Sequence, residues 1–191
     1  MSRSITAGRA CALLLAIAIP CAGVAHARDH ATGGARSVAG AQEFLRQVLP
    51  GNRYASTMMS EILERAGREG LRAHFEPLPP IFDAAPLAKC RSLLLADIRA
   101  TDLVVRDPAT GEAAVSALAE LVNDEVVGSP DGFDFGSIRA LRQSGNRVLL
   151  RFAGEQSDAV LYLEGEETAA RVHTALDYLR RHCDASAATG F

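Results

Sequence analysis

Hydrophobic residues recur at three- and four-residue intervals in the first half of the chain, which is the spacing of an amphipathic helix. This spacing predicts a helix over residues 37–49 and a second over residues 54–66, each ended by glycine or proline. A third helix is predicted over residues 83–98, because Cys90 and Leu94 would share its inner face. The N-terminal half is therefore predicted to be mainly helical.

The centre of the chain mixes two spacings. Residues 71–75 alternate between apolar and polar, which predicts a short strand, and residues 102–106 are predicted to form another. Residues 107–111, with proline and glycine in turn positions, predict a tight turn after the second strand. Helical spacing returns over residues 116–127, and the two glycines of residues 128–132 predict a loop.

The last third has the clearest pattern. Residues 133–138 are expected to be extended, and residues 144–146 read as a tight turn. Strict alternation predicts a half-buried strand over residues 148–152, and a further strand is expected over residues 160–163. Residues 169–183 repeat apolar side chains every three or four positions, which predicts an amphipathic helix with its cysteine on the buried side.

These elements predict the α+β class, with a helical N-terminal half packed on a small antiparallel sheet and a long C-terminal amphipathic helix closing it. One domain is expected over residues 37–183, followed by a flexible tail of small residues over 184–191. Three antiparallel strands leading into a closing helix resemble the end of pleckstrin-homology-like domains over about fifty residues. That resemblance is architectural and implies no function.

The N-terminus has the pattern of a cleavable export signal. Two arginines precede an uncharged apolar run over residues 10–19, and the small residues of Ala25-His26-Ala27 suit a signal peptidase. The run is too short to span a membrane. Residues 1–27 are therefore predicted to be a signal peptide and residues 28–36 a flexible leader. The mature protein is expected in the periplasm, with secretion as the alternative.

Cysteine usage agrees with an exported protein. Cys11 and Cys21 would leave with the signal, so the mature chain keeps Cys90 and Cys183. In an oxidising compartment the expected state is a disulfide between them, and the alternative is two buried thiols. Neither cysteine lies in a Cys-x-x-Cys motif, so the bridge is predicted to be structural rather than catalytic.

Charge excludes some classes of partner. After removal of residues 1–27 the chain has eighteen basic and twenty-three acidic side chains, a net charge of −5. Nucleic acid and anionic membrane surfaces select for clustered lysine and arginine, so neither is predicted as a partner. The acidic balance suits a basic protein partner, although it also favours simple solubility.

Motifs for catalysis are missing from the sequence. A serine hydrolase of the common type would show Gly-x-Ser-x-Gly, and the chain has no such segment. The histidines are too scattered to supply the three or four ligands of a zinc site. We therefore predict no catalytic residue, no metal and no cofactor.

The densest group of polar residues is acidic. Its members are Asn123, Asp124, Glu125, Asp131 and Asp134, with two glycines between them. Such oxygen-rich loops can hold calcium, but this spacing follows no known calcium loop, and helix capping and turns explain the residues equally well. We expect this group to be a contact surface for a basic partner or, as the alternative, an ion site.

Three hypotheses for function follow. The first is an exported, non-catalytic protein that binds another protein, a profile similar to that of immunity proteins and inhibitors. The second is an envelope hydrolase with dispersed carboxylates, which predicts a cleft containing a carboxyl group of raised pKa. The third is a carrier of a small apolar ligand in a pocket between the strands and the last helix.

Overall fold

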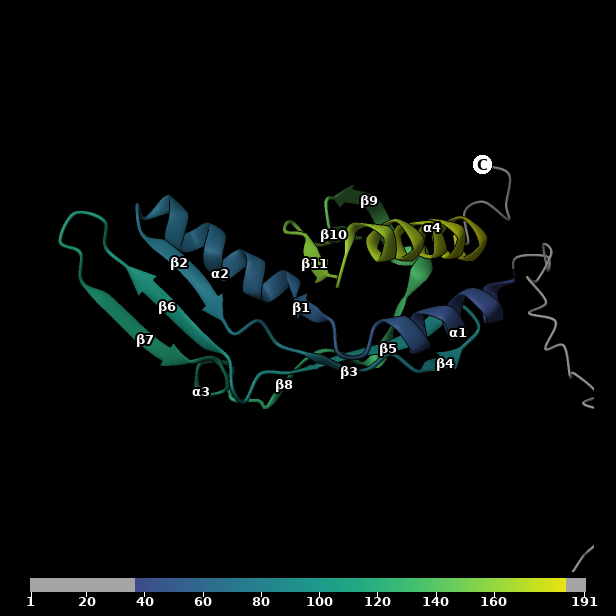
Figure 1. The fold of residues 1–191 in the computed structure, drawn as a ribbon, viewed down its shortest axis with the longest axis horizontal. Helices are drawn as coiled ribbons and strands as arrows, with labels where there is room; N and C mark the ends of the chain where they lie inside the picture. The colour runs from purple at the N-terminus through teal and green to yellow at the C-terminus, as the bar shows by residue number, and fades with distance from the viewer. Residues whose placement is uncertain (1–36, 185–191) are drawn as a thin grey trace, which may run out of the picture. The chain divides into compact units, whose positions relative to one another are not determined.

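Strands are the main elements of the fold (Figure 1). The computed structural model describes residues 37–184, and this range holds eleven strands, four α-helices and one short 3-10 helix. The predicted signal peptide and leader lie outside the described residues, as does the tail from residue 185 onwards. All described residues belong to one unit, Ala35–Phe191. The described helices include none that is long and apolar enough to cross a bilayer.

The first sheet joins the two ends of the described chain. Its order is β1-β11-β10-β9, and all its pairs are antiparallel. The strands are Arg53–Ala55 (β1), Ala159–Tyr162 (β11), Arg147–Phe152 (β10) and Ile138–Ser144 (β9). The predicted strand over residues 148–152 is thus confirmed. In β10 the side chains of Val148 and Leu150 are buried, as the alternation of the sequence predicts.

Two helices from opposite ends of the chain pack together beside this sheet (Figure 1). They are α1 (Val38–Val48) and α4 (Glu166–Cys183). The Ser37 hydroxyl caps α1 by accepting a hydrogen bond from the Gly40 N–H at 3.0 Å. The Arg171 guanidinium of α4 lies 5.1 Å from the centre of the Phe44 ring of α1. The predicted C-terminal amphipathic helix is confirmed, and its apolar face is fully buried.

A second sheet is built around β5. The strands are Ile81–Asp83 (β3), Pro86–Ala88 (β4), Arg91–Asp97 (β5) and Val126–Asp134 (β8). The short strands β3 and β4 pair with opposite ends of β5, while β8 pairs with it from residue 91 to residue 97. The remaining 3-10 helix, Phe135–Ser137, follows β8 directly and contacts α4.

The third sheet has three strands in the order β2-β6-β7. They are Arg72–Glu76 (β2), Asp102–Arg106 (β6) and Ala113–Ala117 (β7). The helix α2 (Thr57–Arg68) contacts β2, and the short helix α3 (Leu118–Val122) follows β7. The predicted strand over residues 102–106 and the turn after it are confirmed, with Gly111 in the left-handed region at φ 77°.

The disulfide between Cys90 and Cys183 is present. It links the turn between β4 and β5 to the last residue of α4, with 5.5 Å between the two Cα atoms and a sequence separation of 93. The structure therefore ties the β5 sheet covalently to the helix that covers the first sheet. The expected α+β class is also confirmed.

The prediction of a mainly helical N-terminal half is wrong. The helices α1 and α2 form close to the predicted residues, but six strands accompany them, and Tyr54 lies in β1 instead of α2. The predicted helix over residues 83–98 is replaced by β3, β4 and β5. Pro86 disfavours the helical conformation at Ala85 before it, and Cys90 takes a left-handed φ of 67°. Beyond Cys90 the buried residues follow a period of two: Ser92, Leu94 and Ala96.

The helix predicted over residues 116–127 is also wrong. Only Leu118–Val122 is helical, because Asn123 ends it in the left-handed region at φ 54°. The predicted loop over residues 128–132 is instead part of β8. Between Ser129 and Phe133, β8 has two more residues than β5 has between Leu94 and Ser92, and this irregularity bulges the strand.

Candidate functional site

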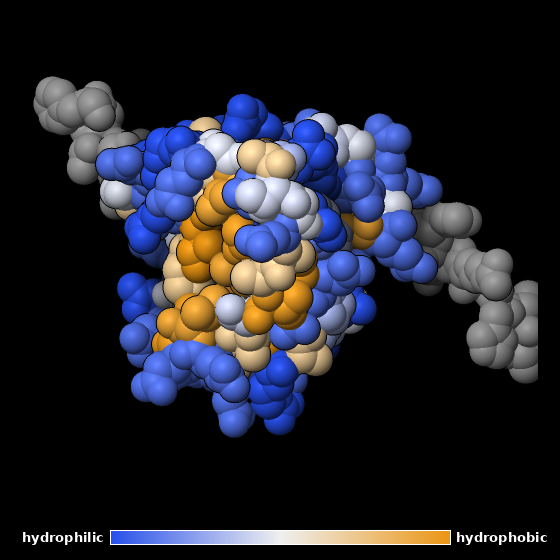
Figure 2. Space-filling view, turned by 90° about the vertical axis from the view of Figure 1, so that its left-hand side faces the viewer, coloured by the Kyte–Doolittle hydropathy of each residue, from blue (hydrophilic) through white to orange (hydrophobic). Residues whose placement is uncertain are grey.

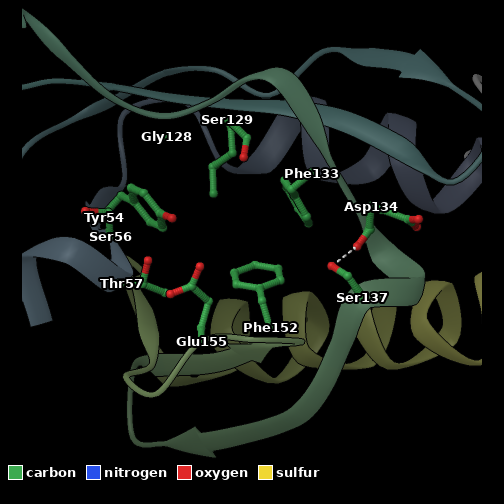
Figure 3. A pocket seen from close by; sticks show the side chains of 11 residues that line it. Tyr54, Ser56, Thr57, Gly128, Ser129, Phe133, Asp134, Ser137, Phe152 and Glu155 are labelled. Atoms are coloured by element: carbon green, nitrogen blue, oxygen red, sulfur yellow. Dashed lines mark hydrogen bonds between the residues drawn. The ribbon is translucent and has the colours of Figure 1, made fainter. Parts of the chain in front are cut away.

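A cavity of about 250 Å³ lies between the first sheet and the β5 sheet (Figure 3). Its walls come from the start of α2, the two sheets and the turn after β10. The lining residues are Tyr54, Ser56, Thr57, Leu94, Gly128, Ser129, Phe133, Asp134, Ser137, Phe152 and Glu155. Four segments distant in sequence therefore combine to form one site.

Tyr54 is the central polar residue of this cavity. Pairing of β1 with β11 sets Tyr54 opposite Leu161, and the Tyr54 N–H donates to the Pro79 carbonyl at 3.0 Å. The side chain is only 5% exposed, yet its hydroxyl makes no hydrogen bond to any residue between 37 and 184. Figure 3 shows this hydroxyl pointing into the cavity. Because the Tyr54 oxygen is not among the enclosed atoms without a partner, water or a ligand in the cavity can bond to it.

The Tyr54 hydroxyl stays protonated at neutral pH. Burial raises the pKa of Tyr54 far above its usual value of about 10, and the negative charge of Glu155 raises it further. The cavity therefore presents a hydroxyl group that both donates and accepts hydrogen bonds.

This raised pKa predicts a pH effect on stability. Above about pH 10 a tyrosine in the unfolded chain loses its proton, whereas Tyr54 in the folded protein keeps it. The unfolded state is thereby favoured, so stability falls as the pH rises from about 10 towards the folded-state pKa, by up to about 1.4 kcal/mol per pH unit. Urea unfolding between about pH 9 and 11 should show this decline in the wild type. Tyr54→Phe should decline less steeply, and equal slopes would contradict the assignment.

Two carboxylates line the cavity, and they differ. The Asp134 carboxylate accepts a hydrogen bond from the Gly136 N–H at 2.8 Å, and in Figure 3 it points away from the cavity. Glu155 lies in the turn after β10, where its N–H donates to the Phe152 carbonyl at 3.2 Å. Its side chain forms no ion pair or hydrogen bond within the described part of the chain. Glu155 is thus the carboxylate of the cavity that is available to accept a hydrogen bond from a ligand or to pair with a cation.

Aromatic rings and hydroxyls complete the walls. The rings of Phe133 and Phe152 meet edge to face with 5.6 Å between their centres. Ser137 uses its hydroxyl to donate to the Asp134 carbonyl at 2.6 Å. By contrast, the hydroxyls of Thr57 and Ser129 have no partner among the described residues. The site can therefore hold a ligand that combines an apolar stem, hydrogen-bond donors and positive charge.

The predicted acidic group is not brought together by the fold. Asn123 ends α3, and the Asp124 carboxylate accepts hydrogen bonds from the N–H groups of the next two residues, Glu125 and Val126. Asp131 lies in the bulge of β8, and Asp134 lies at the far end of that strand. The length of β8 places the two ends of the group about 20 Å apart. Only Asp134 lines the cavity.

The described residues include no group of three or more histidine, cysteine or acidic side chains placed to hold a metal ion. Between residues 37 and 184, three carboxyl groups have a clearly shifted pKa: Glu43, Asp97 and Asp177. Hydrogen bonds from neighbouring arginines lower the pKa of Glu43 and of Asp97, each to about 2. Burial opposes the lowering at Asp177, where hydrogen bonds from Arg180 and Arg181 outweigh it. These shifts are opposite to the one that a general acid requires.

Sequence reasoning missed Tyr54, Thr57 and Glu155. Tyr54 was expected to pack within a helix, and Glu155 stood in a turn with no motif around it. Comparison with protein-family models, curated proteins and solved structures finds no match for this chain.

Proposed function

We propose that this chain is an exported, non-catalytic protein that binds another protein, and that the cavity receives a basic side chain of that partner. The observation that carries the proposal is the Tyr54 hydroxyl, which has no hydrogen-bond partner among the described residues, points into the cavity and shares it with the unpaired carboxylate of Glu155. The periplasm remains the proposed location, which the disulfide supports.

The cavity chemistry favours a cation with an apolar stem. A lysine or arginine side chain would place its charge near Glu155 and its N–H groups near the oxygen of Tyr54. Its methylene groups would lie against Phe133 and Phe152, whose ring faces also attract cations. An apolar ligand would instead leave Tyr54, Thr57 and Glu155 without partners, so the carrier hypothesis is less well supported.

Size favours a side chain over a whole small molecule. Pockets for small molecules usually measure about 300–1,000 Å³, and this cavity of about 250 Å³ falls below that range. The net charge of −5 for residues 28–191 would also attract a basic partner over long distances. The partner is therefore proposed to present one exposed lysine or arginine on a basic surface.

Replacing the free carboxylate tests this function. Glu155→Gln keeps the size of the side chain but removes its charge, so affinity for acetyl-Gly-Arg-Gly-amide should fall about tenfold, as expected for one charge-assisted hydrogen bond. Tyr54→Phe should also weaken binding. The measurement is a titration followed by NMR chemical shifts, with the citrulline peptide as the uncharged comparison.

Glu112→Gln is the matched control, since it removes the same charge from an exposed turn outside the cavity. It should leave the affinity unchanged. Binding that is equal for the arginine and citrulline peptides, or equal for Glu155→Gln and Glu112→Gln, would refute the proposed role of the cavity. The same variants then identify the partner, which should be captured from envelope extract by wild type and Glu112→Gln and depleted with Glu155→Gln.

A further inference from the structure

We infer that β7 pairs with β7 of a second copy of this chain, so that two β2-β6-β7 sheets join into one across a two-fold axis at Val115. This interface lies outside the cavity, and dimerisation through it is measured without any ligand. Its failure and the failure of the proposed function are therefore separate results.

The outer edge of β7 lacks the usual protection against pairing. Its sequence is Ala-Ala-Val-Ser-Ala, without charge or proline, and four of its five residues are exposed. The opposite edge strand of this sheet, β2, has Arg72, His74 and Glu76, and the edge strand β9 of the first sheet has Arg139 and Arg142. Charged side chains normally keep exposed edges apart, so β7 is open to another strand.

The alternation of hydrogen-bonded pairs along β6 and β7 shows which backbone N–H and carbonyl groups of β7 are free. Leu118 N–H donates to the Thr101 carbonyl at 2.9 Å, and Asp107 N–H donates to the Glu112 carbonyl at 3.0 Å. Both pairs belong to the register of β6 with β7. Bonded pairs alternate along antiparallel strands, so residues 114 and 116 also bond to β6. The N–H and carbonyl groups of Ala113, Val115 and Ala117 therefore face the open edge.

The free backbone groups at this edge can pair with the same groups of a second copy. With two copies antiparallel about Val115, each Val115 would face the partner's Val115, and Ala113 would face the partner's Ala117. The three pairs would form about six hydrogen bonds. Glu112 would lie opposite the partner's Leu118, so the two Glu112 side chains would be about 20 Å apart and would not repel strongly.

Side chains on one face of the sheet support the same arrangement. Val115 is 62% exposed, and the register places it beside Val104. Figure 2 views the side that carries β6 and β7 in Figure 1 and shows hydrophobic residues exposed there. Pairing about Val115 would extend this apolar row through the partner's Val115 to the partner's Val104, and the two Val115 side chains would cover part of each other's surface.

Charges on that face are also complementary. Register places Arg72 and Arg106 in one row with Ala113, while Glu76 and Asp102 share a row with Ala117. Because Ala113 would lie beside the partner's Ala117, the basic row of each copy would continue into the acidic row of the other. The second copy is thus favoured over an unrelated strand by its charge as well as by its hydrogen-bond pattern.

Crosslinking tests the register. Opposed residues of a hydrogen-bonded antiparallel pair have Cα atoms about 5.5 Å apart, which a disulfide can span. Val115→Cys should therefore oxidise to a covalent dimer with Cys90–Cys183 intact, as read by non-reducing mass spectrometry. Ala114→Cys is the matched control, since its two copies would be offset by two residues along the strands, and it should give at least fivefold less dimer.

Sedimentation measures the association itself. Wild type should show concentration-dependent dimerisation, and Val115→Lys, which opposes two charges at the axis, should weaken it at least tenfold. Leu121→Lys alters an exposed residue of α3 outside the edge and should leave it unchanged. A wild type that stays monomeric at millimolar concentration would overturn the inference, as would equal crosslinking of Val115→Cys and Ala114→Cys.

Discussion

Replacing both Cys90 and Cys183 by serine is expected to lower the free energy of unfolding by about 4 to 5 kcal/mol. The bridge closes a loop of 93 residues, and a loop of that length loses about this much conformational freedom in the unfolded chain. The whole stability of a domain is about 5 to 15 kcal/mol, so the variant should be only marginally folded. Urea unfolding at neutral pH measures the difference.

Wild type treated with a reducing agent is the matched comparison, because it lacks the same bridge but keeps both sulfur atoms. It should unfold at nearly the same urea concentration as the double serine variant. A loss below about 1 kcal/mol in both would show that the link between the β5 sheet and α4 adds little to packing that already holds α4 in place.

Gly128→Ala is expected to destabilise the protein by about 2 to 6 kcal/mol. Gly128 has φ 138°, a conformation that side chains rarely adopt, and an added Cβ would overlap the carbonyl oxygen of Leu94 in the paired strand β5. Backbone strain and steric overlap each cost about 1 to 3 kcal/mol. Because Gly128 also lines the cavity, the variant should lose binding of the arginine peptide together with stability.

Gly67→Ala is the control for this substitution. Gly67 lies within α2, and an added Cβ would meet no atom within 4 Å. Alanine favours helix over glycine, so this variant should gain up to about 1 kcal/mol. Thermal unfolding of the two variants should therefore shift in opposite directions, and a neutral Gly128→Ala would mean that β8 does not approach β5 as closely as the structure shows.

The elements that the sequence predicted correctly are those in which apolar residues follow a single dominant spacing. In β10 the alternation of Val148 and Leu150 with less buried neighbours leaves only a strand as the interpretation. In α4 the apolar residues recur over an 18-residue helix, which is too long a pattern to arise in a strand. Local pattern and tertiary burial agree in both elements, and the predictions are confirmed.

The prediction of a helix over residues 83–98 failed because the helical spacing and the two-residue spacing of a strand are both present there. Alanine and leucine favour helix, and Cys90 with Leu94 fit helical spacing, but Leu94 and Ala96 also fit a strand. The choice is made by pairing with β8, about thirty to forty residues later in the chain. A window of sequence around β5 does not contain that information.

The candidate site was missed for a related reason. Its residues come from separate segments that include Tyr54, Gly128 and Glu155, so no spacing within the chain marks them. The unpartnered hydroxyl of Tyr54 is a property of the packed structure, since any tyrosine in the unfolded chain bonds to water. The predicted acidic residues lie within one short stretch of sequence, residues 123–134, but the length of β8 separates its two ends.

The first sheet constrains the order in which the protein can fold during synthesis. Its edge strand β1 ends at Ala55, while its neighbour β11 begins at Ala159, so more than a hundred residues must be made before they can pair. The helix α1 likewise cannot pack against α4 until α4 has been synthesised. Contacts so distant in sequence form late and slowly. The nascent chain thus lacks its first sheet until residue 162 has been made, and the α1–α4 pair until residue 183, whereas the β2-β6-β7 sheet can pair as soon as residue 117 has been made.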